Sequence, residues 1–186
     1  MQVSSGTEVH VRTVELLTAM LARPVMQNNF RAWYSEAQVG ILLGEEWVSA
    51  GADWGSFDFL HPATGTTLEV KSSAAKQSWK QRGPSTTTFD IAPRRGFFVD
   101  GDDLNEWHEY AGGAQRAADI YVFTWHPIFD GSCDQRDERQ WEYFVAPTER
   151  LPISQKTIRL SALRSICSAA NCDSLRRWST ASCATD

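Results

Sequence analysis

Two short segments carry a pair of carboxylates and an amine at a spacing typical of metal-assisted hydrolysis. Asp58 lies between Phe57 and Phe59, and Glu69 and Lys71 lie two residues apart. Mg²⁺ prefers carboxylate oxygens and usually takes only one or two of them from a protein. The bound ion lowers the pKa of a water molecule, and an amine beside it positions that water and offsets charge on a phosphate. These residues therefore predict hydrolysis of a phosphodiester bond.

The two segments are predicted to be the strands of a β-hairpin. Residues 56–60 and 67–71 have strand-like patterns, and residues 61–65 (HPATG) are typical of a turn. A five-residue loop would give the wrong parity to place Asp58 opposite Glu69. We therefore expect a loop of four or six residues, or a bulge.

Alternation along each strand predicts which side chains share a face. In the second strand the apolar residues should face the core, which leaves Glu69 and Lys71 side by side on the other face. In the first strand Phe57 and Phe59 should share one face and leave Asp58 on the opposite one. The three polar groups would then meet at one place.

A third carboxylate lies on a predicted helix from about residue 29 to residue 43. The neighbours of Glu36 at helical spacing are apolar or small, and this stripe should face the core. A carboxylate there is costly unless it is paired, protonated or bound to a metal ion. We expect Glu36 to join the site; the alternative is that it reaches water or pairs with Arg31. The neighbours are Ala32, Trp33, Val39, Gly40 and Leu43.

The remaining elements predict an α/β fold with a mixed central β-sheet flanked by helices. Residues 119–125 are apolar on both faces, which is typical of a central strand covered on two sides. We expect one domain over 1–186, with its core at about 5–166 and a peripheral tail at 167–186. The other predictions are helices at 5–22, near 104–110 and at 161–166, strands at 88–91, 97–99 and 141–146, and a loop with a short helical piece at 72–84.

Composition favours an ordinary soluble domain. The chain has 186 residues, 42% of them hydrophobic, and no apolar run long enough to cross a membrane. No secretory signal pattern is present, so we expect a cytoplasmic protein. The four cysteines form no CxxC pair and are expected to be plain thiols.

Charge bears on nucleic-acid binding in two ways. The net charge of −5 argues against a protein that coats nucleic acid. A local basic group follows the motif and offsets that objection; it consists of Lys76, Lys80, Arg82, Arg94 and Arg95. Trp54 and Trp79 flank the motif, where they either stack on bases or pack against the protein.

The motif resembles that of a known superfamily. Residues 69–74 read EVKSSA and are preceded by FDF at 57–59 and by the glutamate-bearing helix. This combination is similar to the PD-(D/E)XK nucleases, which include many restriction endonucleases and repair or defence nucleases. Phe57 replaces the proline of the name, as the family often tolerates. The resemblance implies a restriction endonuclease-like core and a Mg²⁺-dependent phosphodiesterase, with Mn²⁺ able to substitute.

The resemblance also implies roles by position. Asp58 matches the metal-binding aspartate, and Glu69 and Lys71 match the (D/E)-x-K pair. Glu36 resembles an additional helical glutamate of many members, and Gln77 is similar to a polar residue that some members use near the phosphate or metal. The implied metal ligands are Glu36, Asp58 and Glu69.

The expected substrate is DNA, in a restriction or defence role. Because one such site cuts one strand, a double-strand break would need a homodimer or a second binding event. Two alternatives remain open: an RNA-directed nuclease with the same chemistry, and a catalytically inactive nucleic-acid-binding module on the same fold. The need for a partner protein is not encoded in these residues, and no membrane association is expected.

Overall fold

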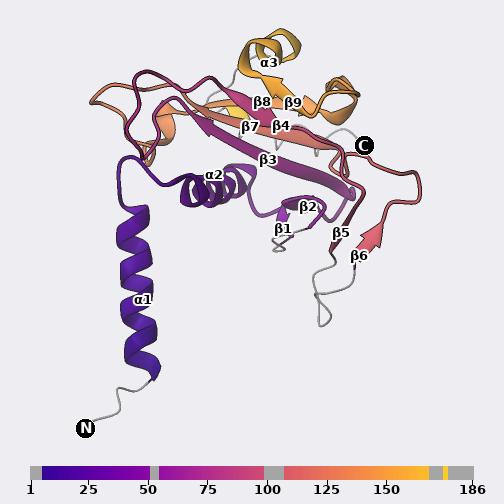
Figure 1. Cartoon of the computed structure of the whole chain (residues 1–186). Helices are drawn as coiled ribbons and strands as arrows, with labels where there is room; N and C mark the ends of the chain where they lie inside the picture. The colour runs from indigo at the N-terminus through magenta and orange to yellow at the C-terminus, as the bar shows by residue number, and fades with distance from the viewer. Residues whose placement is uncertain (1–5, 51–54, 99–106, 168–173, 176–186) are drawn as a thin grey trace.

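The computed structural model describes residues 6–50, 55–98, 107–167 and 174–175 (Figure 1). Its centre is a five-stranded sheet in the order β1-β2-β3-β7-β8. Strand β3 is parallel to β7, and the other neighbouring pairs are antiparallel, so the sheet is mixed as predicted. The strands are β1 Val48–Ser49, β2 Phe59–His61, β3 Thr66–Ala74, β7 Ile120–His126 and β8 Glu142–Pro147.

Helix α2, Asn28–Leu43, packs on one face of this sheet. It ends at Gly44, whose φ of 89° is a backbone conformation that glycine adopts readily. The side chains buried between helix and sheet include Val39, Leu42, Leu43, Leu68, Val70, Val122 and Tyr143.

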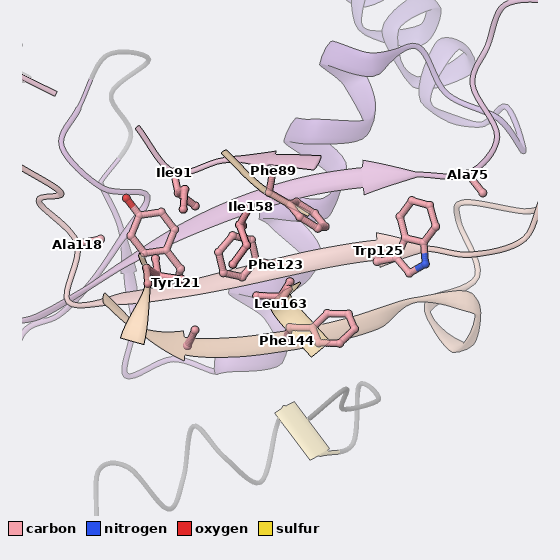
Figure 2. Packing of buried hydrophobic residues seen from close by; sticks show 12 residues of the cluster. Ala75, Phe89, Ile91, Ala118, Tyr121, Phe123, Trp125, Phe144, Ile158 and Leu163 are labelled. Atoms are coloured by element: carbon pink, nitrogen blue, oxygen red, sulfur yellow. The ribbon is translucent and has the colours of Figure 1, made fainter. Parts of the chain in front are cut away.

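The opposite face is covered by smaller elements. These are β4 Thr88–Asp90, its antiparallel partner β9 Thr157–Arg159, and helix α3, Leu160–Ile166. Figure 2 shows the buried side chains on this face, among them Phe89, Ile91, Tyr121, Phe123, Phe144, Ile158 and Leu163. Because β7 is buried on both faces, the predicted mixed central sheet flanked by helices is confirmed.

Helix α1, Gly6–Leu21, extends away from the rest of the chain (Figure 1). The segment after it is held firmly, because the side chain of Arg136 donates to the carbonyl of Ala22 at 2.6 Å. The backbone N–H of Gln135 donates to the carbonyl of Pro24 at 2.7 Å. The side-chain oxygen of Gln135 accepts from the backbone N–H of Met26 at 2.8 Å. Within the described ranges, no helix is long and apolar enough to span a bilayer.

Two predictions of local structure are wrong. Residues 72–74, predicted as loop, continue β3, and the segment 75–87 contains no helical piece. Strand β6, Trp107–Glu109, lies where a helix was predicted and pairs with β5, Gly96–Phe98. Pairing with a neighbouring strand of the sheet overrides local preference for residues 72–74 and for β6.

Further predictions reach the undescribed parts of the chain. The first part of the predicted helix at 104–110 lies outside the described residues, as does Trp54. In the tail at 167–186, Leu175 is one of the few described residues after 167, and it is fully buried in the core under α2.

Candidate active site

The hairpin that carries the predicted motif has a four-residue loop, 62–65. Its register pairs Phe59 with Leu68 and His61 with Thr66. Gly65, with φ of 72°, closes the turn, and its N–H donates to the carbonyl of His61 at 2.8 Å. The predicted parity is therefore confirmed.

Asp58 immediately precedes β2, next to the point where Phe59 pairs with Leu68. The backbone N–H of Asp58 donates to the carbonyl of Leu68 at 2.9 Å. The Asp58 carboxylate accepts from the N–H of Val70 at 2.6 Å. Asp58 is thus attached to the residues on both sides of Glu69, and local backbone pairing sets the position of its carboxylate.

The prediction that Phe57 and Phe59 share a face is wrong. Phe59 packs in the core under α2, and Phe57 packs against the core on the opposite face of the sheet. The reason is that β2 begins only at Phe59, so strict alternation does not extend back to Phe57.

Glu69 and Lys71 lie together on the sheet face opposite α2. The Lys71 ammonium donates a hydrogen bond to the Glu69 carboxylate and forms an ion pair with it. Only 17% of the Glu69 side chain is exposed, and 27% of the Lys71 side chain. Both residues line a cleft of about 430 Å³. Other lining residues are Ser56, Arg94, Trp107, Tyr110, Arg116 and Tyr121.

The carboxylates carry more negative charge than their surroundings neutralise. The pKa of Asp58 is raised to about 6, chiefly by burial and in part by the charge of Glu36, while the hydrogen bond from Val70 opposes the rise. Burial also raises the pKa of Glu69, as does the charge of Asp58. Lys71 opposes both shifts without cancelling them. The site would therefore gain stability from an additional cation.

Glu36 lies close enough to Asp58 to affect its pKa, but the predicted core stripe around it is partly wrong. The buried residues of α2 are Arg31, Ser35, Val39, Leu42 and Leu43, whereas Ala32 and Trp33 are exposed. Glu36 is half-buried at the edge of that stripe. The helix comes close to β2 here because Gly40 has no side chain: a Cβ would lie 2.8 Å from the Phe59 ring.

Gln77 lies beyond the end of β3 and is tied into a separate buried network. Its side-chain oxygen accepts from Arg31 at 3.0 Å, and its side-chain nitrogen donates to the carbonyl of Ala74 at 2.7 Å. Among the described residues, none of its hydrogen bonds reaches Asp58, Glu69 or Lys71. The structure brings the latter three together and leaves Gln77 apart.

The sequence alone did not predict that aromatic and basic residues line the cleft together. Tyr121 is paired with Glu69 across the parallel β3–β7 ladder, and that register has no signal in either segment alone. Arg116 donates to the carbonyls of Ile91 and Pro152, both at 2.6 Å, so it braces the cleft wall. Arg94, a member of the predicted basic group, forms an ion pair with Asp90.

The donor set fits a hard divalent ion by its chemistry. No three His, Cys, Asp or Glu side chains in the described ranges form a ready-made metal cluster. Two half-buried carboxylates with raised pKa values are nevertheless sufficient protein ligands for Mg²⁺, which retains several waters.

Comparison with known proteins assigns no family. No protein-family profile and no curated protein matches the sequence. Among solved structures, a bacterial homing endonuclease, I-Ssp6803I, is similar over 72% of this chain and 77% of its own. The sequence identity is 15% and the TM-score is 0.39.

Proposed function

We propose that the chain is a metal-dependent nuclease of the PD-(D/E)XK type that hydrolyses phosphodiester bonds, with DNA as the favoured substrate. The observation that carries this proposal is that Asp58 is held beside Glu69, and that Lys71 pairs with Glu69 where both line a cleft. Metal-assisted attack on phosphorus requires carboxylates that hold the metal ion, and an ammonium beside them offsets charge on the phosphate.

Asp58 and Glu69 would hold the metal ion, and Glu36 would complete the set from α2. Mg²⁺ is the expected ion, with Mn²⁺ able to substitute. When bound, it would supply the charge that activates water and stabilises a phosphate. A bound metal ion would neutralise the charge of Asp58 and Glu69. Both carboxylates are largely kept from solvent, and Lys71 is the lysine beside them.

Lys71 would hold the attacking water and offset the negative charge that develops on the phosphate. Its amine already lies at the carboxylate, so binding of a metal ion by Glu69 would leave it adjacent to the reacting group. Arg94 lines the same cleft and is 63% exposed, which suits a contact to a neighbouring phosphate. Trp107 at the cleft is 46% exposed and offers a surface for a base.

The test is incubation of the purified chain with supercoiled plasmid in Mg²⁺, Mn²⁺ or EDTA. The expected result is nicking or linearisation that requires the metal ion and is lost in Glu69→Gln. Glu149→Gln, an exposed carboxylate, serves as the matched control and should cleave like the wild type. A parallel reaction with single-stranded RNA separates the two substrates. Cleavage that persists in Glu69→Gln would contradict the proposed site, whichever substrate is cut.

A further inference from the structure

Helix α1 exposes an apolar face that no other described part of the chain covers. Side-chain exposure is 60% for Val9, 63% for Leu16 and 45% for Leu17. Its charged residues lie on a different side of the helix, where Glu8 and Arg12 form an ion pair at 3.2 Å. An isolated helix of this length is marginal in water, because most helical stability in proteins comes from packing of the apolar face. The helix therefore requires a partner.

A second apolar surface lies on the outer side of α2. Trp33 is 58% exposed and Ile41 is 77% exposed, with Ala37 between them at helical spacing. These residues line a groove of about 680 Å³. Gly40 and Phe59 also line it, and so do the acidic residues Glu36 and Glu45. Two large exposed side chains on one stripe beside a groove are typical of an interaction surface.

The chain holds α1 away from its own α2 groove. Three hydrogen bonds fasten the segment between the two helices to residues 135 and 136, and Met26 in that segment is fully buried. Pro24 also prevents the two helices from joining into one. Folding α1 back would break these contacts, and Figure 1 shows the helix directed away from the sheet.

We propose that two copies of this chain form a two-fold dimer in which α1 of each copy packs in the α2 groove of the other. One exchange covers both apolar surfaces, and two-fold symmetry supplies the same contact twice. The doubling matters because α1, with 16 residues, is only about 24 Å long. A stable interface buries roughly 800 Å² per partner, and two symmetric contacts bury twice the area of one.

The lengths of the two surfaces agree with this arrangement. Helices α1 and α2 both have 16 residues, so one spans the other. Leu16 and Leu17 would lie against Trp33 and Ile41, with Ala37 giving room for close approach of the helices. Glu36, a proposed metal ligand, also lines this groove. The dimer is nevertheless tested separately from the nuclease activity, since its test measures association alone and changes neither Glu36, Asp58, Glu69 nor Lys71.

The test is sedimentation equilibrium of the full chain over a wide concentration range. The wild type is expected to dimerise. Leu16→Glu on α1 and Ile41→Arg on α2 should each raise the dimer dissociation constant at least about 100-fold, because each change occurs in both contacts. Both residues are exposed within one chain, so the variants should fold as monomers, which circular dichroism verifies. Ile153→Glu is the matched control: Ile153 is 88% exposed and lies on neither helix.

Mixing the two weakened variants distinguishes exchange from pairing of α1 with itself. In a mixed dimer one contact is wild type and the other brings the new glutamate to the new arginine, so dimers should reappear. Three results would overturn the proposal. They are a wild type that stays monomeric at all concentrations, an Ile41→Arg variant that dimerises like the wild type, and an Ile153→Glu variant that loses the dimer equally.

Discussion

Asp58 is hydrogen-bonded to both sequence neighbours of Glu69, Leu68 and Val70. Its N–H donates to Leu68, and its carboxylate accepts from the N–H of Val70 at 2.6 Å. These two hydrogen bonds to the β3 backbone hold the Asp58 carboxylate near Glu69, and the charge of Asp58 contributes to the raised pKa of Glu69. Single substitutions at the site should therefore change metal binding in ways that can be measured separately from changes in stability.

Replacement of Asp58 by asparagine should remove the charge and keep the fold. The amide oxygen can still accept from Val70, so the free energy of unfolding should change little. Affinity for Mn²⁺ should fall at least about tenfold, since one of the proposed carboxylate ligands is lost. Isothermal titration measures the affinity, with Glu149→Gln as a control that should bind like the wild type. Unchanged affinity in Asp58→Asn would remove this residue from the metal site.

Metal binding should weaken as pH falls through about 6, the raised pKa of Asp58 in the folded chain. An unfolded aspartate has a pKa near 3.9, so the folded, metal-free protein binds more protons between about pH 4 and pH 6. The stability contributed by this proton is present at low pH and is lost as pH rises through 6.

The rise in melting temperature on adding Mg²⁺ should accordingly be larger at pH 7.5 than at pH 5. A metal ion and a proton compete for the same oxygens, and the ionised carboxylate is the better ligand. Melting curves at both pH values, with and without Mg²⁺, give the comparison. In Asp58→Asn the difference between the two pH values should shrink; a wild-type rise independent of pH would contradict the assignment.

Substitution of Gly96 by alanine should disrupt the β5–β6 hairpin, because a Cβ there would lie 2.0 Å from the backbone oxygen of His108. We expect the free energy of unfolding to fall by about 1–3 kcal/mol. Gly83→Ala is the matched control, since no heavy atom lies within 4 Å of its Cβ position. Chemical denaturation of both variants tests this, and equal stabilities would mean that the hairpin contributes little to the fold.

Gln77→Ala should lower stability more than it lowers metal affinity. Removal of the amide leaves the buried guanidinium of Arg31 without a hydrogen-bond acceptor, at a cost of about 1.5–3 kcal/mol. Denaturation and Mn²⁺ titration on the same preparation separate the two effects. Gln155→Ala, at an exposed position, should change neither. A loss of metal affinity in a fully stable Gln77→Ala protein would instead place Gln77 at the site.

The elements nearest the site were predictable because local patterns determine them. The positions of Asp58 and Glu69 in the chain predicted a loop with an even number of residues or a bulge, and the loop has four residues. The central strand at Ile120–His126 was evident from its continuous apolar run. These features depend on alternation and turn composition, which are properties of short segments.

The remainder depends on contacts between distant segments. Helix α2 carries two apolar stripes, and the buried one continues through Arg31, whose guanidinium finds an acceptor in Gln77. Periodicity alone does not show which stripe faces the sheet. The parallel register that sets Tyr121 beside Glu69 has the same origin, since nothing within either strand specifies its partner.

The central claim is that Lys71, paired with Glu69 in the cleft, serves the hydrolysis of a phosphodiester bond. Its most direct test is the single-turnover cleavage rate of plasmid DNA in Mg²⁺ for the wild type and Lys71→Ala, with Lys156→Ala as an exposed lysine control. The account predicts that Lys71→Ala cleaves at least about 100-fold more slowly and that Lys156→Ala is unchanged. Metal-dependent cleavage at the wild-type rate in Lys71→Ala would contradict it.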